Sequence, residues 1–188
     1  MKRFYSILTF FLLFSVVVLS QDFAKKGIWE IGGSVGFSGS TPVYAGTSHT
    51  SEATSTFTLA PEASYFITDN FELGLKPFSF IVINAYSEHI TEFSFEIAPA
   101  YNFDMKSNMY PYIQALIGYG PISTGDNYSA SGFDYGIQGG VKIEVAKSSV
   151  LNFGISYLMT NRAPSGANVR YGNNIIQLLA GFSVFITQ

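Results

Sequence analysis

The chain is poor in several residue types, and each shortage excludes something. It has no cysteine, so it has neither a disulfide nor a thiol to which a lipid could be attached. Only 12% of its 188 residues are charged, whereas about a quarter is usual in soluble proteins. The net charge of -3 and the lack of a basic run argue against a nucleic-acid partner. After Ser20, no apolar run reaches the roughly 20 residues of a membrane-spanning helix.

The first 20 residues have the features of an export signal. Lys2 and Arg3 precede an almost entirely apolar stretch over residues 4–19, and Val18, Leu19 and Ser20 suit a signal peptidase. We predict a signal peptide over residues 1–20 that is cleaved before Gln21, with an uncleaved anchor as the alternative. Residues 21–188 then form one domain.

The mature part alternates apolar and small polar residues. The clearest stretch is residues 133–145, where Phe133, Tyr135 and Ile137 alternate with Asp134, Gly136 and Gln138. A period of two indicates a strand with two unlike faces. Such stretches cover residues 27–37, 55–67, 71–83, 92–103, 110–120, 133–145, 151–160 and 175–187. They predict an all-β fold, an eight-stranded antiparallel up-and-down transmembrane β-barrel over residues 21–188.

A soluble lipocalin-like barrel would show the same period with its apolar face inward. Its polar face would then meet water and carry many charged residues. Here that face is mostly Gly, Ser, Ala, Thr and Asn, which suit the narrow interior of an eight-stranded barrel. The composition therefore favours the transmembrane barrel.

The connections and the prolines add detail to this barrel. Short turns are expected at residues 68–70, 104–108 and 146–150, and long outer loops at residues 38–54, 84–91, 121–131 and 161–174, the usual pattern of outer-membrane barrels. Pro61, Pro77 and Pro99 fall inside expected strands, where proline cannot donate a ladder hydrogen bond. We predict a β-bulge at each of the three, and we leave the register of the third strand after Lys76 open.

Outward aromatic residues sort into two heights. Two girdles are expected where aromatic rings meet lipid headgroups. The lower girdle, on the periplasmic side, is expected to contain Trp29, Tyr65, Phe71, Tyr101, Phe103 and Phe153, and the upper one Phe37, Phe57, Phe93, Tyr119, Phe133, Tyr135 and Tyr157.

Three segments resemble the outer-membrane β-barrel domain family. Residues 57–75 resemble its second hairpin, and residues 27–33 and 109–119 resemble its first and fifth strands. The last strand resembles the family's C-terminal assembly signal in part, because Phe182, Val184 and Ile186 fit but the chain ends in Thr187 and Gln188. The resemblance implies a small outer-membrane, porin-like barrel that is inserted by the barrel-assembly machinery, and it implies location more than function.

Inward charges are the main candidates for a functional site. We expect Glu62, Lys76, Glu96 and Lys142 midway along the strands and three carboxylates, Glu30, Glu72 and Glu144, nearer the periplasmic mouth. Because unpaired buried charges are costly, the first four are predicted to form one network that blocks the lumen. A gate or ion path is the alternative interpretation.

A catalytic site is not predicted, and no cofactor or metal is expected. His49 and Ser51 have the His-x-Ser spacing of an outer-membrane lipid A deacylase, with Glu52 or Glu88 as possible orienting groups. The pair lies in a Ser/Thr-rich loop, where such triplets arise by chance. His89 is expected in another outer loop. Arg162 and Arg170 are expected in a solvated outer loop, with contact to anionic headgroups as the alternative.

The sequence therefore predicts a non-enzymatic barrel in the outer membrane of a two-membrane bacterium, in contact with outer-membrane lipid. Its expected role is structural or in surface interaction, without a wide pore. A narrow channel for small solutes or hydrophobic compounds is the alternative, and a lipid-modifying enzyme a distant one. The sequence names no surface ligand.

Overall fold

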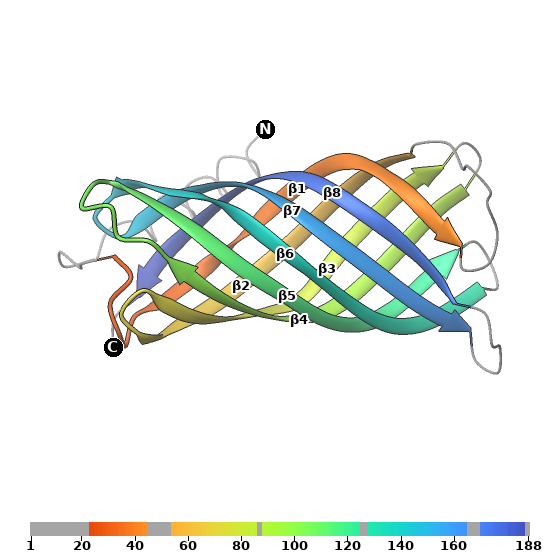
Figure 1. The fold of residues 1–188 in the computed structure, drawn as a ribbon, viewed down its shortest axis with the longest axis horizontal. Coiled ribbons are helices and arrows are strands. Elements are labelled where there is room, and N and C mark those ends of the chain that lie inside the picture. Colours follow the sequence, from red (N-terminus) through yellow and green to blue (C-terminus); the bar gives the residue numbers. More distant parts are fainter. Residues whose placement is uncertain (1–22, 45–53, 86–87, 125–127, 165–169, 187–188) are drawn as a thin grey trace, which may run out of the picture.

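The computed structural model describes residues 23–44, 54–85, 88–124, 128–164 and 170–186, which form a closed barrel of eight antiparallel strands (Figure 1). Each strand pairs with its neighbours in sequence, and β1 pairs with β8 to close the barrel. The strands are β1 (Trp29–Tyr44), β2 (Thr54–Thr68), β3 (Phe71–Ala85), β4 (Glu88–Asn102), β5 (Met109–Thr124), β6 (Tyr128–Ala146), β7 (Ser149–Pro164) and β8 (Tyr171–Ile186). The predicted up-and-down fold is confirmed.

The two faces of the wall are as unlike as the alternation predicts. On β6, the Ile137 side chain points outward and is 50% exposed, whereas the next residue, Gln138, points into the lumen and is 7% exposed. A similar alternation holds on the other strands: large apolar residues face outward, and the inner face is mostly small or polar, with two buried apolar groups inside the barrel. An apolar exterior around a polar lumen is the arrangement of a transmembrane barrel. No helix in the described part of the chain is both long and apolar enough to cross a membrane.

The connections fall into two groups at opposite ends of the barrel (Figure 1). At the turn end, β2–β3, β4–β5 and β6–β7 are joined by two to six residues. At the other, loop end, the strands extend beyond the predicted boundaries. β1 continues to Tyr44 and β7 to Pro164, so the predicted loops at residues 38–54 and 161–174 were drawn too long. Polar ladders continue there because the backbone hydrogen bonds of a closed barrel do not depend on an apolar face.

Of the three predicted proline bulges, one is present. Between Lys76 and Ser79, β3 has one residue more than β4 opposite it, and the register against β2 shifts at the same place. The bulge lies at Pro77, and it moves the inward positions of β3 from even numbers to odd ones, so Ile81 and Ile83 are buried in the lumen. This settles the open register of the third strand.

Pro61 and Pro99 have no bulge of their own, contrary to the prediction. Pro61 pairs in unbroken register with Gly33 and lies opposite the β3 bulge, where the β2–β3 ladder is already interrupted. Pro99 pairs with Leu73 without a register change. The bulge at Pro77 therefore serves two prolines, Pro77 on β3 and Pro61 on the neighbouring β2, neither of which has an amide hydrogen to donate.

Candidate functional site

The lumen holds three clusters of charged side chains, stacked from the turn end to the loop end. The Lys142 cluster, nearest the turn end, consists of Lys142 on β6, Glu30 on β1 and Glu72 on β3. Lys142 Nζ lies 2.7 Å from Glu30 Oε2 and 2.6 Å from Glu72 Oε1. Asn102 Nδ2 donates to the same Glu72 oxygen at 2.9 Å. Because these strands are not neighbours, the ion pairs cross the lumen.

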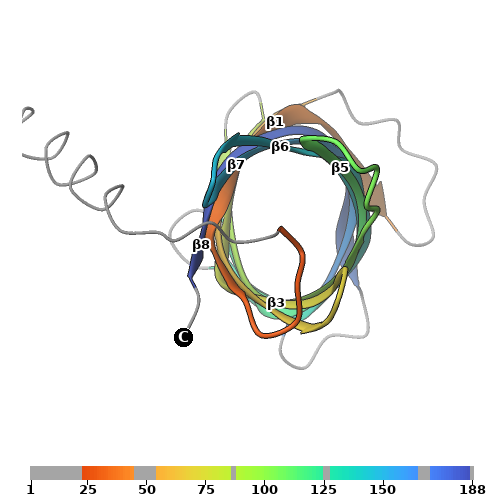
Figure 2. The ribbon, with the colours of Figure 1, turned by 90° about the vertical axis from the view of Figure 1, so that its left-hand side faces the viewer.

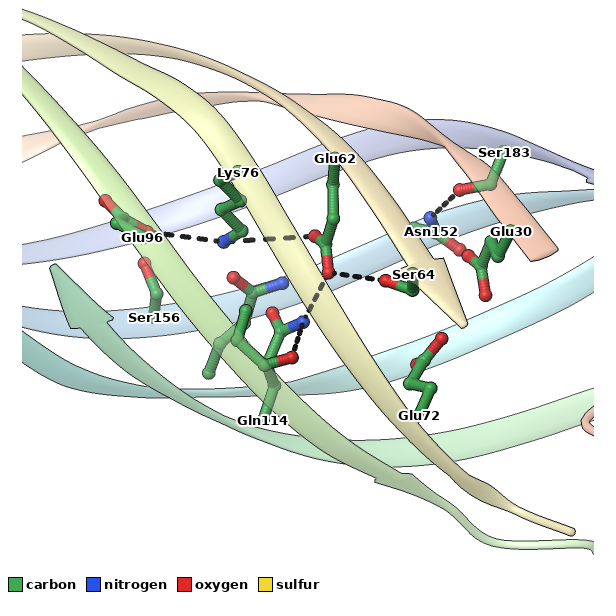
Figure 3. A network of polar contacts seen from close by, with 12 residues as sticks. Glu30, Glu62, Ser64, Glu72, Lys76, Glu96, Gln114, Asn152, Ser156 and Ser183 are labelled. Atoms are coloured by element: carbon green, nitrogen blue, oxygen red, sulfur yellow. Dashed lines mark hydrogen bonds and ion pairs between the residues drawn. The ribbon is translucent and has the colours of Figure 1, made fainter. Parts of the chain in front are cut away.

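The Lys76 cluster lies further along and consists of Glu62, Lys76 and Glu96 on three adjacent strands (Figure 3). Lys76 Nζ lies between the two carboxylates, 4.0 Å from Glu62 Oε2 and 3.8 Å from Glu96 Oε2. Ser64 Oγ and Gln114 Nε2 donate to Glu62 Oε1, at 3.0 and 2.7 Å. These neutral donors replace part of the hydration that the carboxylate loses on burial.

The predicted single network of Glu62, Lys76, Glu96 and Lys142 is therefore wrong in one member. Lys142 pairs with Glu30 and Glu72, two of the carboxylates expected nearer the periplasmic mouth, and not with the other three residues. Its height was misjudged because the strands are staggered around the barrel. In the register Lys142 lies opposite Tyr110, the second residue of β5, and is thus close to the turn end.

The third expected mouth carboxylate, Glu144, lies beyond these clusters. Its side chain is half-buried, and it has no ion-pair partner among the described residues. The β6 register against β7 shifts directly after it. Glu144 is therefore placed at the turn end as predicted but does not join the Lys142 cluster.

The Arg162 cluster, nearest the loop end, was not predicted. Arg162 on β7 is only 1% exposed and contacts Asp134 Oδ1 and, at 3.3 Å, Glu92 Oε2. Asn173 Nδ2 donates to Glu92 Oε1 at 3.1 Å. The prediction of Arg162 in a solvated or headgroup-contacting loop is wrong, because β7 continues to Pro164 and keeps its even-numbered residues inward. Arg170 is exposed and donates to Asn161 Oδ1 at 3.5 Å.

Continued parity is the signal that could have located the Arg162 cluster. Ser156, Leu158 and Thr160 are even-numbered and inward on β7, and Arg162 follows them. Asp134 occupies an even position in the alternation of β6. Glycine gives these carboxylates room: Gly118 lies in register between Glu96 and Asp134, and a Cβ there would come within 2.7 Å of Glu96 Cγ. The small residues of the inner face thus allow charged side chains to lie against the wall.

Little space remains between the clusters. A cavity of about 30 Å³ adjoins Glu30, Glu62 and Lys142, and one of about 20 Å³ adjoins Lys76 and Glu96. A water molecule needs about 10–15 Å³ by this measure, so each cavity holds one or two. Each cluster also sets two carboxyl groups against one cation, so acidic side chains outnumber cationic ones in all three.

The aromatic side chains that were predicted to form girdles all lie on the outer surface, exposed or half-exposed. Neighbouring rings contact each other near both ends: Trp29 with Tyr65, centroids 5.0 Å apart, and Tyr101 with Phe103, also 5.0 Å, at the turn end, and Tyr119 with Phe133, 5.1 Å, at the loop end. Their contact with lipid headgroups stays a prediction.

The structure does not describe the side chains that were considered for catalysis. His49, Ser51 and Glu52 lie outside the described residues, as do the side chains of Glu88 and His89. The signal peptide predicted over residues 1–20 lies outside them too. Within the described part of the chain, no group of three or more His, Cys, Asp or Glu residues is arranged to hold a metal ion.

Comparison with known proteins gives matches in structure. No protein-family model matches the chain, and no curated protein matches it in sequence. Among solved structures it is similar to Neisserial surface protein A (NspA), with a TM-score of 0.61 and 19% identity over 85% of this chain and 97% of that one.

Two further structures share the fold. The outer membrane protein OprG from Pseudomonas aeruginosa has a TM-score of 0.53 and 14% identity, covering 87% of this chain and 98% of that one. The outer membrane enzyme PagL has a TM-score of 0.50 and 16% identity, covering 81% and 97%. These similarities show that the chain has the fold of small eight-stranded outer-membrane barrels, as the sequence resemblance implied. Their differing names leave the role open.

Proposed function

We propose that this chain is an integral outer-membrane protein whose barrel does not conduct solutes and whose role is structural or in surface interaction. The observation that carries the proposal is the filled lumen. Three charged clusters occupy it in succession, and the cavities beside two of them have volumes of about 30 and 20 Å³. A permeant ion would have to break buried ion pairs at each cluster.

The outer-membrane location is supported by the apolar exterior and by the export signal expected over residues 1–20. The three similar barrels are all bacterial surface or outer-membrane proteins by name. We place the turn end at the periplasm, because outer-membrane barrels have short periplasmic turns. Lipid then surrounds the wall, and the barrel-assembly machinery inserts it.

A narrow channel is the second candidate. It is favoured by the two cavities, which adjoin the Lys142 and Lys76 clusters, and by the excess of acidic over cationic side chains in the lumen. Such a channel would pass small cations in preference to anions, because each cluster has one carboxylate more than it has cations.

Conductance in planar lipid bilayers separates the two candidates. We expect the purified barrel to give no steady current at neutral pH, with a known porin in the same bilayer as a positive control. A steady, cation-selective current through the native chain would contradict the closed barrel and support the channel.

The enzyme possibility needs a separate test. We propose that the chain has no lipid-modifying activity, although a barrel of this fold, PagL, is an enzyme by name. The lipid A of a strain lacking the protein should be unchanged by mass spectrometry. A lost acyl-chain modification that His49→Ala fails to restore would contradict this proposal.

A further inference from the structure

The six residues before β1 do not trail away from the barrel. Residues 23–28, which we call the N-terminal segment, turn across the mouth at the turn end and reach its centre (Figure 2). Phe23, Ala24 and Ile28 are buried, at 8%, 1% and 5% exposure. The sequence did not predict this, because residues 23–26 precede the first alternating stretch and residues 27 and 28 were assigned to the first strand, which begins at Trp29 in the structure.

The barrel wall offers this segment an apolar site. Phe66, Val150 and Phe185 point inward at the turn end and form one buried cluster with Phe23, Ala24 and Ile28. The Phe23 ring lies 5.0 Å from that of Phe185 and 6.1 Å from that of Phe66. Inward apolar residues are out of place at the mouth of a polar lumen. They are accounted for by an apolar occupant, and the occupant is the chain's own N-terminal segment.

Hydrogen bonds hold the segment to the β2–β3 hairpin. The Gly27 amide donates to the Phe66 carbonyl at 2.9 Å, and the Phe66 amide donates to the Ile28 carbonyl at 3.0 Å. The Asn70 amide donates to the Ala24 carbonyl at 2.7 Å. These bonds satisfy polar backbone groups that would otherwise be buried without partners.

Asp69, in the β2–β3 turn, is a second anchor. Its Oδ1 accepts a hydrogen bond from the Lys26 amide at 2.9 Å, and its Oδ2 lies 3.7 Å from Lys25 Nζ. The Lys26 amide and the charge of Lys25 hold the pKa of Asp69 below its usual value. The anchor is exposed to solvent, so it is suited to weakening the contact without disturbing the lumen.

The segment also covers the Lys142 cluster. Lys142 Nζ lies 5.8 Å from the centroid of the Phe23 ring, and 6.0 and 5.5 Å from those of Phe66 and Tyr112. Three aromatic faces at such distances stabilise an ammonium group. With Phe23 in place, water at the mouth is separated from this ion cluster by a packed apolar layer.

We propose that residues 23–28 are an intramolecular plug that docks on the inward apolar residues of the turn end and seals the lumen there. The proposal rests on the closed barrel of the proposed function and adds a further seal at the turn end, beyond the charged clusters. The charged clusters further in fill the lumen but leave water-sized gaps, whereas Phe23, Ala24 and Ile28 of the plug add an apolar layer.

Thiol labelling tests the docking, because the native chain has no cysteine. Ala24→Cys introduces a thiol at a buried position within the plug, and Lys147→Cys introduces one on the exposed β6–β7 turn at the same end. In the folded barrel a membrane-impermeant maleimide should label Cys at position 24 at least about tenfold more slowly than at position 147, and equally fast after unfolding. Adding Asp69→Asn to Ala24→Cys should speed its labelling. Equal rates at the two positions in the folded barrel would overturn the docking.

Conductance of plug variants tests the seal. Phe23→Ala should give a small cation-selective current through a barrel that still folds, and Phe23→Leu, which keeps an apolar side chain, should stay closed. If Phe23→Ala does not fold, Asp69→Asn, which leaves the core intact, should give brief openings that the native chain lacks. A silent native barrel with equally silent folded variants would overturn the plug as the seal while leaving the closed barrel standing. A current through the native barrel itself would instead contradict the proposed function.

Discussion

At the residue scale, the barrel depends on matching each buried cation with carboxylates. Lys76, Lys142 and Arg162 each contact two acidic side chains. Neutral groups donate to these carboxylates as well: Gln114 donates to Glu62 Oε1, and Asn102 donates to the Glu72 Oε1 that Lys142 also contacts. Removing one charge from such a group leaves its partner buried and unpaired, which costs more than the pair itself contributes.

Partner-specific rescue should show that the Lys76 and Lys142 clusters are separate. Lys76→Met should lower the free energy of unfolding by about 3 kcal/mol, and adding Glu62→Gln should recover about 1 kcal/mol or more. Lys142→Met should be rescued by Glu72→Gln and not by Glu62→Gln. Urea titrations of the refolded barrel measure these values, with the exposed Lys106→Met as a control. If Glu62→Gln rescued both lysine variants, Lys76 and Lys142 would belong to one network, as the sequence predicted.

At the element scale, alternation decides which face each side chain joins, and the bulge at Pro77 interrupts it within β3. Pro77 lies in the bulge, where β3 has one residue more than β4. After the bulge, the odd-numbered residues of β3 point inward. The bulge turns Ile81 and Ile83 toward the lumen, where they pack with Ala98, Leu116, Leu158 and Ile175. These residues form an apolar layer inside the barrel. Without the bulge, Ile81 and Ile83 would face the lipid instead.

Deleting Pro77 should be tolerated. The deletion removes the extra residue, so β3 regains an unbroken ladder while every later residue keeps its face. Deleting Val82 from the same strand should prevent folding, because the residues after it would exchange faces. The fraction of refolded protein that migrates as the folded form in unboiled gels measures both. Equal loss in the two deletions would show that the bulge is needed for more than register.

Neighbouring residues on β6 should respond in opposite ways to polarity. Ile137→Arg places a charge on the lipid face and should cost about 2–4 kcal/mol of folding free energy. Gln138→Met loses one hydrogen bond to the Tyr112 hydroxyl, 2.8 Å long, and should cost about 1 kcal/mol. Folding in lipid vesicles at graded urea concentrations measures both. A harmless Ile137→Arg would mean that the apolar face is not in lipid.

At the scale of the whole molecule, the barrel is a closed wall with a filled interior. Every strand has two hydrogen-bonded neighbours, so the wall has no free edge. Charge clusters occupy the interior along its length, and by our proposals these clusters and residues 23–28 close it. Such a structure opens only by breaking many contacts together, which favours a stable scaffold over a gated pore.

Fractionation of a cell that makes the protein should recover it in the outer membrane. Because a closed barrel resists detergent unless heated, the unboiled protein should migrate differently from the boiled one. The mature N-terminus, read by mass spectrometry, should be Gln21, two residues ahead of the plug. Recovery from the soluble periplasmic fraction would contradict the location, and a mature chain that starts after Phe23 would remove the plug.

By itself, the sequence determined the number of strands, their faces and the polarity of the lumen. These follow from period-two alternation, which is local and survives in any register. Short turns such as Asp69–Asn70 were equally readable, since Asn70 adopts the left-handed conformation (φ 68°) that asparagine tolerates.

Only the tertiary structure decided which charges meet. Lys142 on β6 pairs with Glu30 on β1 and Glu72 on β3 because the stagger of the strands brings these three side chains to one height in the lumen. The alternation of residues along a strand does not reveal the stagger between strands. Arg162 was misplaced because strand ends are set by pairing with neighbours. The N-terminal segment was missed because residues 23–26 have no periodicity and residues 27 and 28 were assigned to the first strand. Its site exists only once closure of the barrel brings Phe66, Val150 and Phe185 together.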